Sequence, residues 1–279
     1  MTADPAAALR EQARDWGRAR LATPPWAPLE HRLTLLLIDP PVEEWVPPSS
    51  SSTLWLAVDG AEVRELPAEL REPLLRDGSV HESTPAVLGS QDGRISVFTL
   101  DRLEGLIAGV GGRSLEARWS IRHGEAVHDP LRRHAALSGA AARLPEDGLE
   151  RAVRPLFVQA CGALAAVEAL SRERVTDGLA ALGEAAAALT RLACVLDEGA
   201  HPPAQWLLPA ARGTELGQRL ATWLDDVAPA LSGEHPTAAS RVIDGCGAVR
   251  RAIDSAVRPQ FSRADWFQSP ETWALRPRR

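Results

Sequence analysis

Hydrophobic residues recur at helical spacing through almost the whole second half of the chain. They stand three or four positions apart in two long runs, residues 149–167 and 179–196, which is typical of amphipathic helices that turn one face to a core. Two prolines at 202–203 interrupt the pattern. Helical periodicity then resumes over residues 204–211, 214–227 and 237–257. We therefore predict that residues 130–258 are helical, contain no strand and form a bundle.

The first half has a different residue pattern, in which short apolar runs are separated by loops rich in Pro and Ser. Compact runs of buried-strand length occupy residues 33–38, 53–58 and 94–98. Alternation of Leu115, Ala117, Trp119 and Ile121 favours a further strand over residues 115–127. Asp59-Gly60 suits the positive φ of a tight turn, so residues 53–66 are expected to form a β-hairpin. Helices are predicted at residues 5–20, 67–76 and 100–109.

The expected fold class is α/β (α+β), a small mixed sheet with flanking helices, followed by an all-α helical bundle. The predicted domains are residues 1–130 and 131–258, with a loosely ordered tail at 259–279. A cleft between the two domains is the default place for a ligand.

Composition narrows the classes of function. The chain has 279 residues and a formal net charge of −6, so a wide basic surface for nucleic acid is not expected. Every basic residue outside the seven histidines is arginine, so an anion would meet a planar guanidinium fork. The three cysteines lie in apolar segments with helical periodicity, which favours buried free thiols over a disulfide or a zinc site. There is no signal-like start, and no apolar run reaches the ~20 residues of a membrane span. We expect a soluble, cytoplasmic protein that binds neither nucleic acid nor membrane.

Several segments resemble one enzyme family. The matching text runs from Ala117-Arg118-Trp119 to Val127-His128-Asp129-Pro130, and on through Leu156-Phe157, Arg172, Leu196-Asp197 and His201-Pro202-Pro203-Ala204-Gln205-Trp206. With the α/β half before it, this pattern is similar to the kanamycin-type nucleotidyltransferases and their bacterial relatives. In those proteins Asp-Pro opens the helical bundle and a Lys-Trp pair precedes a helix. Here Gln205 replaces that Lys.

The resemblance implies a catalytic motif, Gly-Ser after the first strand and Asp-x-Asp at the start of the second. Two Mg²⁺ ions bridge those carboxylates and a triphosphate, so hard oxygen ligands are indispensable. In this chain the first strand is followed by Asp39-Pro40. The paired Asp positions fall on Ser51 and Thr53 or, with a slip of one residue, on Ser52 and Leu54. Neither registration supplies two carboxylates, so the motif is degenerate.

Other residues near the expected site could replace the missing carboxylates or line the ligand cleft. The possible replacement carboxylates are Asp39, Glu43, Glu44, Asp59, Glu62 and Glu65, although solvated loop positions account for them more simply. Trp45 and Gln205 are candidates for the ligand cleft, together with Arg64, Arg118 and Arg122. His123 and His128 would point to opposite faces of the strand predicted over 115–127 and could not easily share a metal.

Three functions remain open at this stage. The first is a nucleotidyltransferase-fold protein without the usual metal site, repurposed to bind a nucleotide or other small molecule. The second is an active transferase or biosynthetic enzyme with a rebuilt acidic site, which alone would need Mg²⁺. The third is a non-catalytic partner subunit. A homodimer is expected by analogy with the family.

Overall fold

The computed structural model describes residues 5–38, 53–88, 91–170, 174–233, 236–269 and Thr272. The chain separates into two compact units, unit 1 (Met1–Arg143) and unit 2 (Leu144–Arg279). The helix α6 (Arg133–Ala141) packs on α5 (Gly112–His123) and on β1 of unit 1. The division at residue 143 therefore places this helix with the sheet, whereas the sequence prediction placed the boundary at residue 130, before it.

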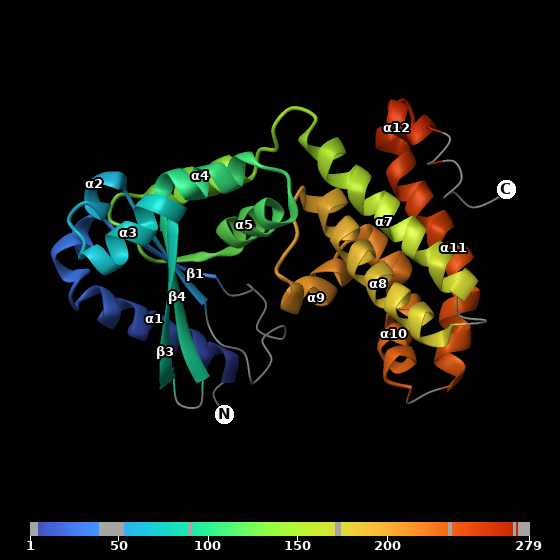
Figure 1. The fold of residues 1–279 in the computed structure, drawn as a ribbon, viewed down its shortest axis with the longest axis horizontal. Helices are drawn as coiled ribbons and strands as arrows, with labels where there is room; N and C mark the ends of the chain where they lie inside the picture. Colours follow the sequence, from blue (N-terminus) through green and yellow to red (C-terminus); the bar gives the residue numbers. More distant parts are fainter. Residues whose placement is uncertain are drawn as a thin grey trace. The chain divides into compact units, whose positions relative to one another are not determined.

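Unit 1 is built on a mixed five-stranded sheet (Figure 1) with the order β3-β4-β2-β1-β5. The strands are β1 (Thr34–Leu37), β2 (Thr53–Val58), β3 (Ser79–Leu88), β4 (Gln91–Thr99) and β5 (Glu125–His128). β2 runs parallel to β4 and antiparallel to β1, and β1 also pairs antiparallel with β5. β3 and β4 form an antiparallel hairpin. The predicted α+β architecture is confirmed.

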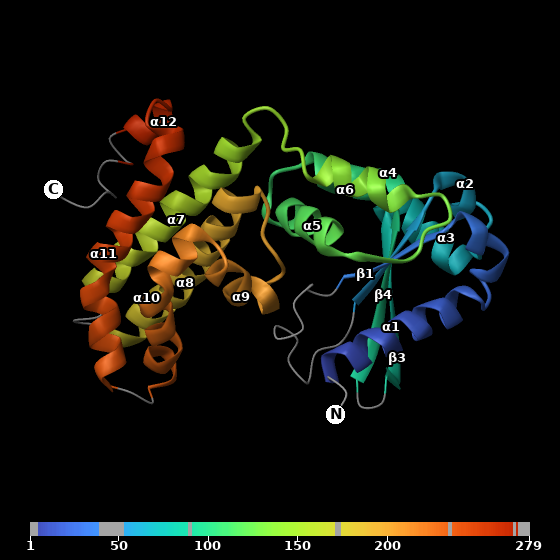
Figure 2. The ribbon, with the colours of Figure 1, turned by 180° about the vertical axis from the view of Figure 1, so that it is seen from behind.

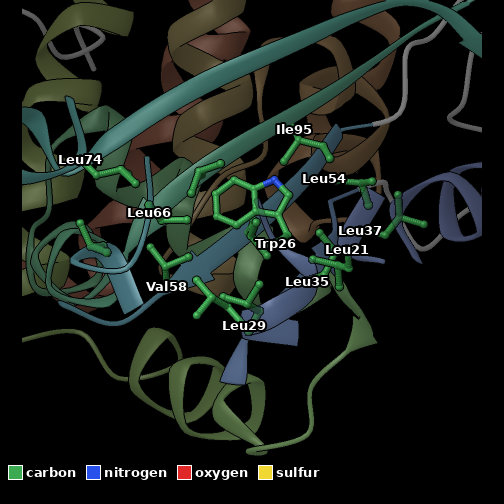
Figure 3. Packing of buried hydrophobic residues seen from close by; sticks show 14 of the residues in the cluster. Leu21, Trp26, Leu29, Leu35, Leu37, Leu54, Val58, Leu66, Leu74 and Ile95 are labelled. Atoms are coloured by element: carbon green, nitrogen blue, oxygen red, sulfur yellow. The ribbon is translucent and has the colours of Figure 1, made fainter. Parts of the chain in front are cut away.

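Helices cover both faces of this sheet. One core contains Leu54, Leu56 and Val58 of β2 and is closed by α1 (Pro5–Leu21), α2 (Gly60–Val63) and α3 (Ala68–Asp77). Trp26, from the segment leading into a short 3₁₀ helix (Ala27–Arg32), is fully buried within it (Figure 3). The second core contains Ala57 and is closed by α4 (Leu100–Ala108), α5 and α6, of which α4 and α6 lie side by side (Figure 2).

Unit 2 consists of helices in its described part. They are α7 (Gly148–Leu170), α8 (Val175–Glu198), η3 (Ala204–Trp206), α9 (Leu207–Arg212), α10 (Glu215–Ser232), α11 (Pro236–Phe261) and α12 (Asp265–Gln268). Residues 144–170, 174–233 and 236–269 include no strand, so the helical prediction is confirmed for these ranges. All three cysteines are buried and free, as expected. Burial raises the pKa of the Cys194 and Cys246 thiols to about 12.

The predicted loose tail is wrong for its first part. α11 continues to Phe261, and α12 brings Trp266 and Phe267 into the core. Both rings lie 5.7 Å from the ring of Phe157 in α7, centroid to centroid. Edge-to-face aromatic contacts of this kind add to the apolar burial, so α12 is anchored to the bundle.

Two helices of unit 2 have the length and apolar composition of a membrane-spanning helix, whereas no segment of this kind was expected from the sequence. Gly148–Ala169 and Thr176–Glu198 are long and apolar enough to span a membrane by length and composition alone. In their most apolar windows, 44% and 56% of the residues are buried inside the protein. α7 and α8 pack closely on each other, and α8 also packs on α10. Part of each apolar surface is thus buried within the bundle.

Three predictions in unit 1 are wrong. Asp59-Gly60 is not a hairpin turn, because the Asp59 side chain accepts a hydrogen bond from Ala61 N and begins α2. Residues 115–123 are helical rather than extended. Residues 117–121 of α5 are all buried, so the helix lacks the polar face by which helical periodicity is recognised. No strand was predicted over residues 79–88, where β3 lies.

Gly217 provides a test of the packing in unit 2. A Cβ atom at this position would lie 1.7 Å from the carbonyl oxygen of Ala211, whereas one on Gly183 in α8 would meet nothing within 4 Å. We expect Gly217→Ala to lower the free energy of unfolding by at least about 2 kcal/mol. Gly183→Ala should leave it unchanged or raise it by up to about 1 kcal/mol through helix propensity. Urea unfolding followed by circular dichroism measures both, and equal stability of the two variants would contradict this packing.

Candidate functional site

The start of β2 decides which residues occupy the expected metal-binding positions. Leu54 is fully buried in the core closed by α1–α3. Because side chains alternate along a strand, Thr53 points to the opposite face. Thr53 is half-buried, and its carbonyl accepts a hydrogen bond from Ile38 N at 2.8 Å, just past the end of β1. If the second motif position is Leu54, its side chain therefore lies in the core. If it is Thr53, a hydroxyl lies near the end of β1.

The sheet face that carries Thr53 combines side chains of β2, β3 and β4. In the strand register Thr53 pairs with Arg94, Trp55 with Ser96, and Ser96 also with His81. Directly paired residues point to the same face. We call this surface the Trp55 face; it comprises Thr53, Trp55, His81, Arg94, Ser96 and Phe98.

The Trp55 face combines aromatic rings with hydrogen-bonding groups. The rings of Trp55 and Phe98 are tilted by 56° with centroids 5.0 Å apart, and both are half-buried. His81 is exposed, and its Nδ1 lies 2.9 Å from the hydroxyl oxygen of buried Ser96. Arg94 is exposed at the Thr53 end. Trp55 and Phe98 also pack against the second core, which α4–α6 close, so this face is covered at its Ala57 end. The part toward Thr53 can offer the exposed edge of a half-buried ring to a flat ligand and the Arg94 guanidinium to an anion.

The carboxylate of Glu62 is committed to a buried ion pair. Its side chain is 3% exposed, and Oε1 lies 3.2 Å from Nη2 of Arg133. The second carboxylate oxygen accepts a hydrogen bond from the backbone N of Asp59, which completes a capping box at the start of α2. Arg133 also donates to the carbonyl of Arg32 at 2.6 Å. Glu62 therefore joins α2 to α6 and is held in place on both sides.

Asp59 serves the same local structure. Its side chain accepts from Ala61 N at 3.2 Å and lies 3.8 Å from Nη2 of Arg133. Glu65 pairs with Arg32 at 2.8 Å on a more exposed part of the surface. Each of these three carboxylates thus has an arginine partner in the structure.

Asp129 of the Asp129-Pro130 pair begins a helix, although the helix is α6 of unit 1. Its carboxylate accepts hydrogen bonds from the hydroxyl of Thr34 and from the backbone N atoms of Arg133 and His134, at 2.9, 2.9 and 3.0 Å. These bonds satisfy amide groups at the helix start that have no partner within the helix. The aspartate therefore ties β1 to α6.

His123 and His128 were predicted to lie on one strand, but they belong to different elements. His123 ends α5, where its ring stacks on Trp119 with centroids 4.5 Å apart. His128 lies in β5, and its Nε2 is 2.8 Å from the carbonyl oxygen of Glu30. Among the described residues, no group of three or more His, Cys, Asp or Glu side chains is arranged to hold a metal ion.

The described residues that were proposed for the ligand cleft belong to several different elements. Arg118 is 1% exposed, and its guanidinium donates to the carbonyls of Gly109, Ala141 and Arg143 at 3.3, 2.9 and 2.9 Å. Burial lowers the pKa of Arg118, and its hydrogen bonds join α5 to the end of α6. Arg64 is exposed after α2, Arg122 is half-buried in α5, and Gln205 is exposed in unit 2. Asp39, Glu43, Glu44, Trp45 and Ser51 lie outside the described residues.

Sequence reasoning missed His81, Arg94 and Ser96. A signal for the last two was present, because Arg94, Ser96 and Phe98 alternate with Ile95 and Val97 in the predicted strand. Period-2 alternation of this kind separates a core face from an accessible face. His81 could be assigned only once β3 was known to pair with β4.

Similarity to known proteins is found among solved structures. No protein-family model and no curated protein sequence matches this chain. Among solved structures, the chain is similar to a nucleotidyltransferase-like protein from Exiguobacterium sibiricum, with 13% sequence identity and a TM-score of 0.38. The similarity covers 95% of this chain and 87% of that one. A TM-score of this size does not establish a shared fold.

The Glu62–Arg133 pair gives a quantitative test of the site geometry. Glu62→Gln removes the negative charge while keeping the shape of the side chain, which leaves Arg133 without its buried counterion. We expect a loss of about 1–3 kcal/mol in the free energy of unfolding. The matched control is Glu65→Gln in the exposed pair with Arg32, which should cost less than about 1 kcal/mol. Losses of the same size in the two variants, measured by chemical denaturation, would refute the buried role of Glu62.

Proposed function

We propose that this chain is a nucleotidyltransferase-fold protein that binds a nucleotide or similar small molecule on the Trp55 face without catalysing two-metal nucleotidyl transfer. The observation that carries the proposal is the start of β2, where Leu54 is buried in the core closed by α1–α3 and half-buried Thr53 lies on the opposite face. The expected Asp-x-Asp has no carboxylate at either residue. The assignment to this superfamily rests on the sequence resemblance.

The chemistry of the metal site supports the proposal. Two metal ions about 3.5–4 Å apart must offset the charge on a transferred phosphoryl group. Neutral hydroxyls of Ser51 and Thr53 do not replace the carboxylates, because Mg²⁺ gives up its hydration water reluctantly. Pro40 also lacks the backbone N–H that a phosphate-binding Gly-Ser turn would offer.

The Trp55 face supplies the kinds of group that nucleotides use. Aromatic rings contribute about 1–3 kcal/mol per stacked base, and Trp55 and Phe98 are half-buried, packing in part against the core closed by α4–α6. Arg94 can pair with a phosphate oxygen in a bidentate geometry. His81, held by Ser96, adds a polar group beside the rings. Such a site needs no metal ion to hold its ligand.

The active enzyme with a rebuilt acidic site has less support. Asp59 and Glu62 already serve the α2 capping box and pair with Arg133. Recruiting either would break those contacts, so a rebuilt site would depend on Asp39, Glu43 or Glu44. A cytoplasmic location and a homodimer remain part of this proposal, and no metal cofactor is included in it.

A thermal-shift screen tests the proposed binding. We expect at least one of ATP, GTP, CTP and UTP to raise the melting temperature equally with Mg²⁺ and with EDTA, because the ligand is held by rings and arginine. Arg94→Gln should reduce the shift, while Arg113→Gln, which removes an exposed arginine at the start of α5, should not. A shift that requires Mg²⁺, or one that both variants reduce equally, would count against the proposal.

A further inference from the structure

Helices α10 and α11 are neighbours in unit 2 (Figure 2). Residues of both helices line a pocket. Its volume is about 310 Å³. Leu220 and Trp223 of α10 and Val249 of α11 contribute buried apolar side chains to its lining. The pocket belongs to one unit and uses none of the residues of the Trp55 face.

Small residues on α11 leave this pocket open. Gly245, Ala248 and Ala252 follow one another at helical spacing and all line it. A Cβ atom on Gly245 would lie 2.9 Å from Cδ1 of Trp223, so the indole rests directly against the α11 backbone. Trp223 Nε1 donates a hydrogen bond to the carbonyl of Val242 at 3.0 Å. The ring is thus fixed by the protein itself, and the pocket is preformed.

The charged lining residues leave one positive charge uncompensated. Asp226 is neutralised by a two-pronged contact with Arg241, whose Nε lies 2.9 Å from Oδ2 while Nη2 contacts Oδ1. Arg241 Nη1 also donates to Thr237 at 3.1 Å. Arg219 is exposed and forms no hydrogen bond or ion pair with the side chains that the structure describes. Thr222 lies three residues further along α10, on the same side as Arg219.

We propose that this pocket binds a small organic monoanion with a flat apolar body, of the aromatic carboxylate class. Trp223 and Val249 receive the apolar body, and the Arg219 guanidinium pairs with the carboxylate. The Thr222 hydroxyl donates a hydrogen bond to the same carboxylate. The volume lies at the small end of ligand pockets, which suits one ring system rather than a nucleoside triphosphate. The site is independent of the proposed nucleotide site in unit 1.

Calorimetric titration of the full chain with two naphthalene probes tests the charge requirement. The probes are 1-naphthoate and neutral 1-naphthalenemethanol, which share the ring system and differ in charge. We expect naphthoate to bind more tightly. Arg219→Gln should weaken naphthoate about fivefold and leave the alcohol unchanged. Arg251→Gln changes an exposed arginine of α11 outside the pocket and should affect neither probe.

A blocking variant tests the location. Ala248 is exposed at the pocket, so Ala248→Phe should fill it without disturbing the core and should abolish binding of both probes, with an unchanged circular dichroism spectrum. The proposal is overturned if naphthoate does not bind, binds no better than the alcohol, or binds undiminished to Ala248→Phe. Equal effects of Arg219→Gln and Arg251→Gln would also overturn it, because they would indicate general charge attraction.

Discussion

Alternate side chains of β2 are buried in two separate cores, and the placement of every candidate group in unit 1 depends on this division. Leu54, Leu56 and Val58 pack with α1–α3, while Ala57 packs with α4–α6. Burying each large aliphatic side chain contributes roughly 1.5–3 kcal/mol. A slip of one residue would exchange the two faces along the whole strand. The position of half-buried Thr53 on the face opposite Leu54 is therefore determined by the two cores rather than by the residues before β2.

The polar contacts around α6 depend on the same sheet. Asp129 binds Thr34 at the start of β1 and caps α6, and Arg133 in the first turn of that helix pairs with Glu62 of α2. Both carboxylates hold secondary structure elements in place. Acidic residues close to the expected motif positions can thus be accounted for by folding, and proximity in sequence is weak evidence for a metal site. The two units differ here, since Arg219 at the unit 2 pocket has no such partner among the residues that the structure describes.

Sequence reasoning succeeded where local and global signals agree. The strand at Thr53–Val58 and the long helices of unit 2 were predicted because their apolar residues follow a clear period and are bounded by turn residues. It failed for α5, where burial on all sides removes the polar face, and for Asp59, where a capping box and a tight turn use the same residue type. The Trp55 face combines three strands, so its composition required the pairing of β3 with β4 and could not be obtained from spacing along the chain.

The most direct test of the account is an assay for metal-dependent chemistry. The protein is incubated with labelled nucleoside triphosphates, Mg²⁺ or Mn²⁺ and a panel of hydroxylated acceptors, and pyrophosphate release is measured. Because β2 lacks the carboxylates that hold two metal ions, we expect no release above that of a protein-free control. Metal-dependent release that is abolished by Glu43→Ala, Glu44→Ala or Glu62→Ala, in a variant that still folds, would contradict the account and establish a rebuilt acidic site.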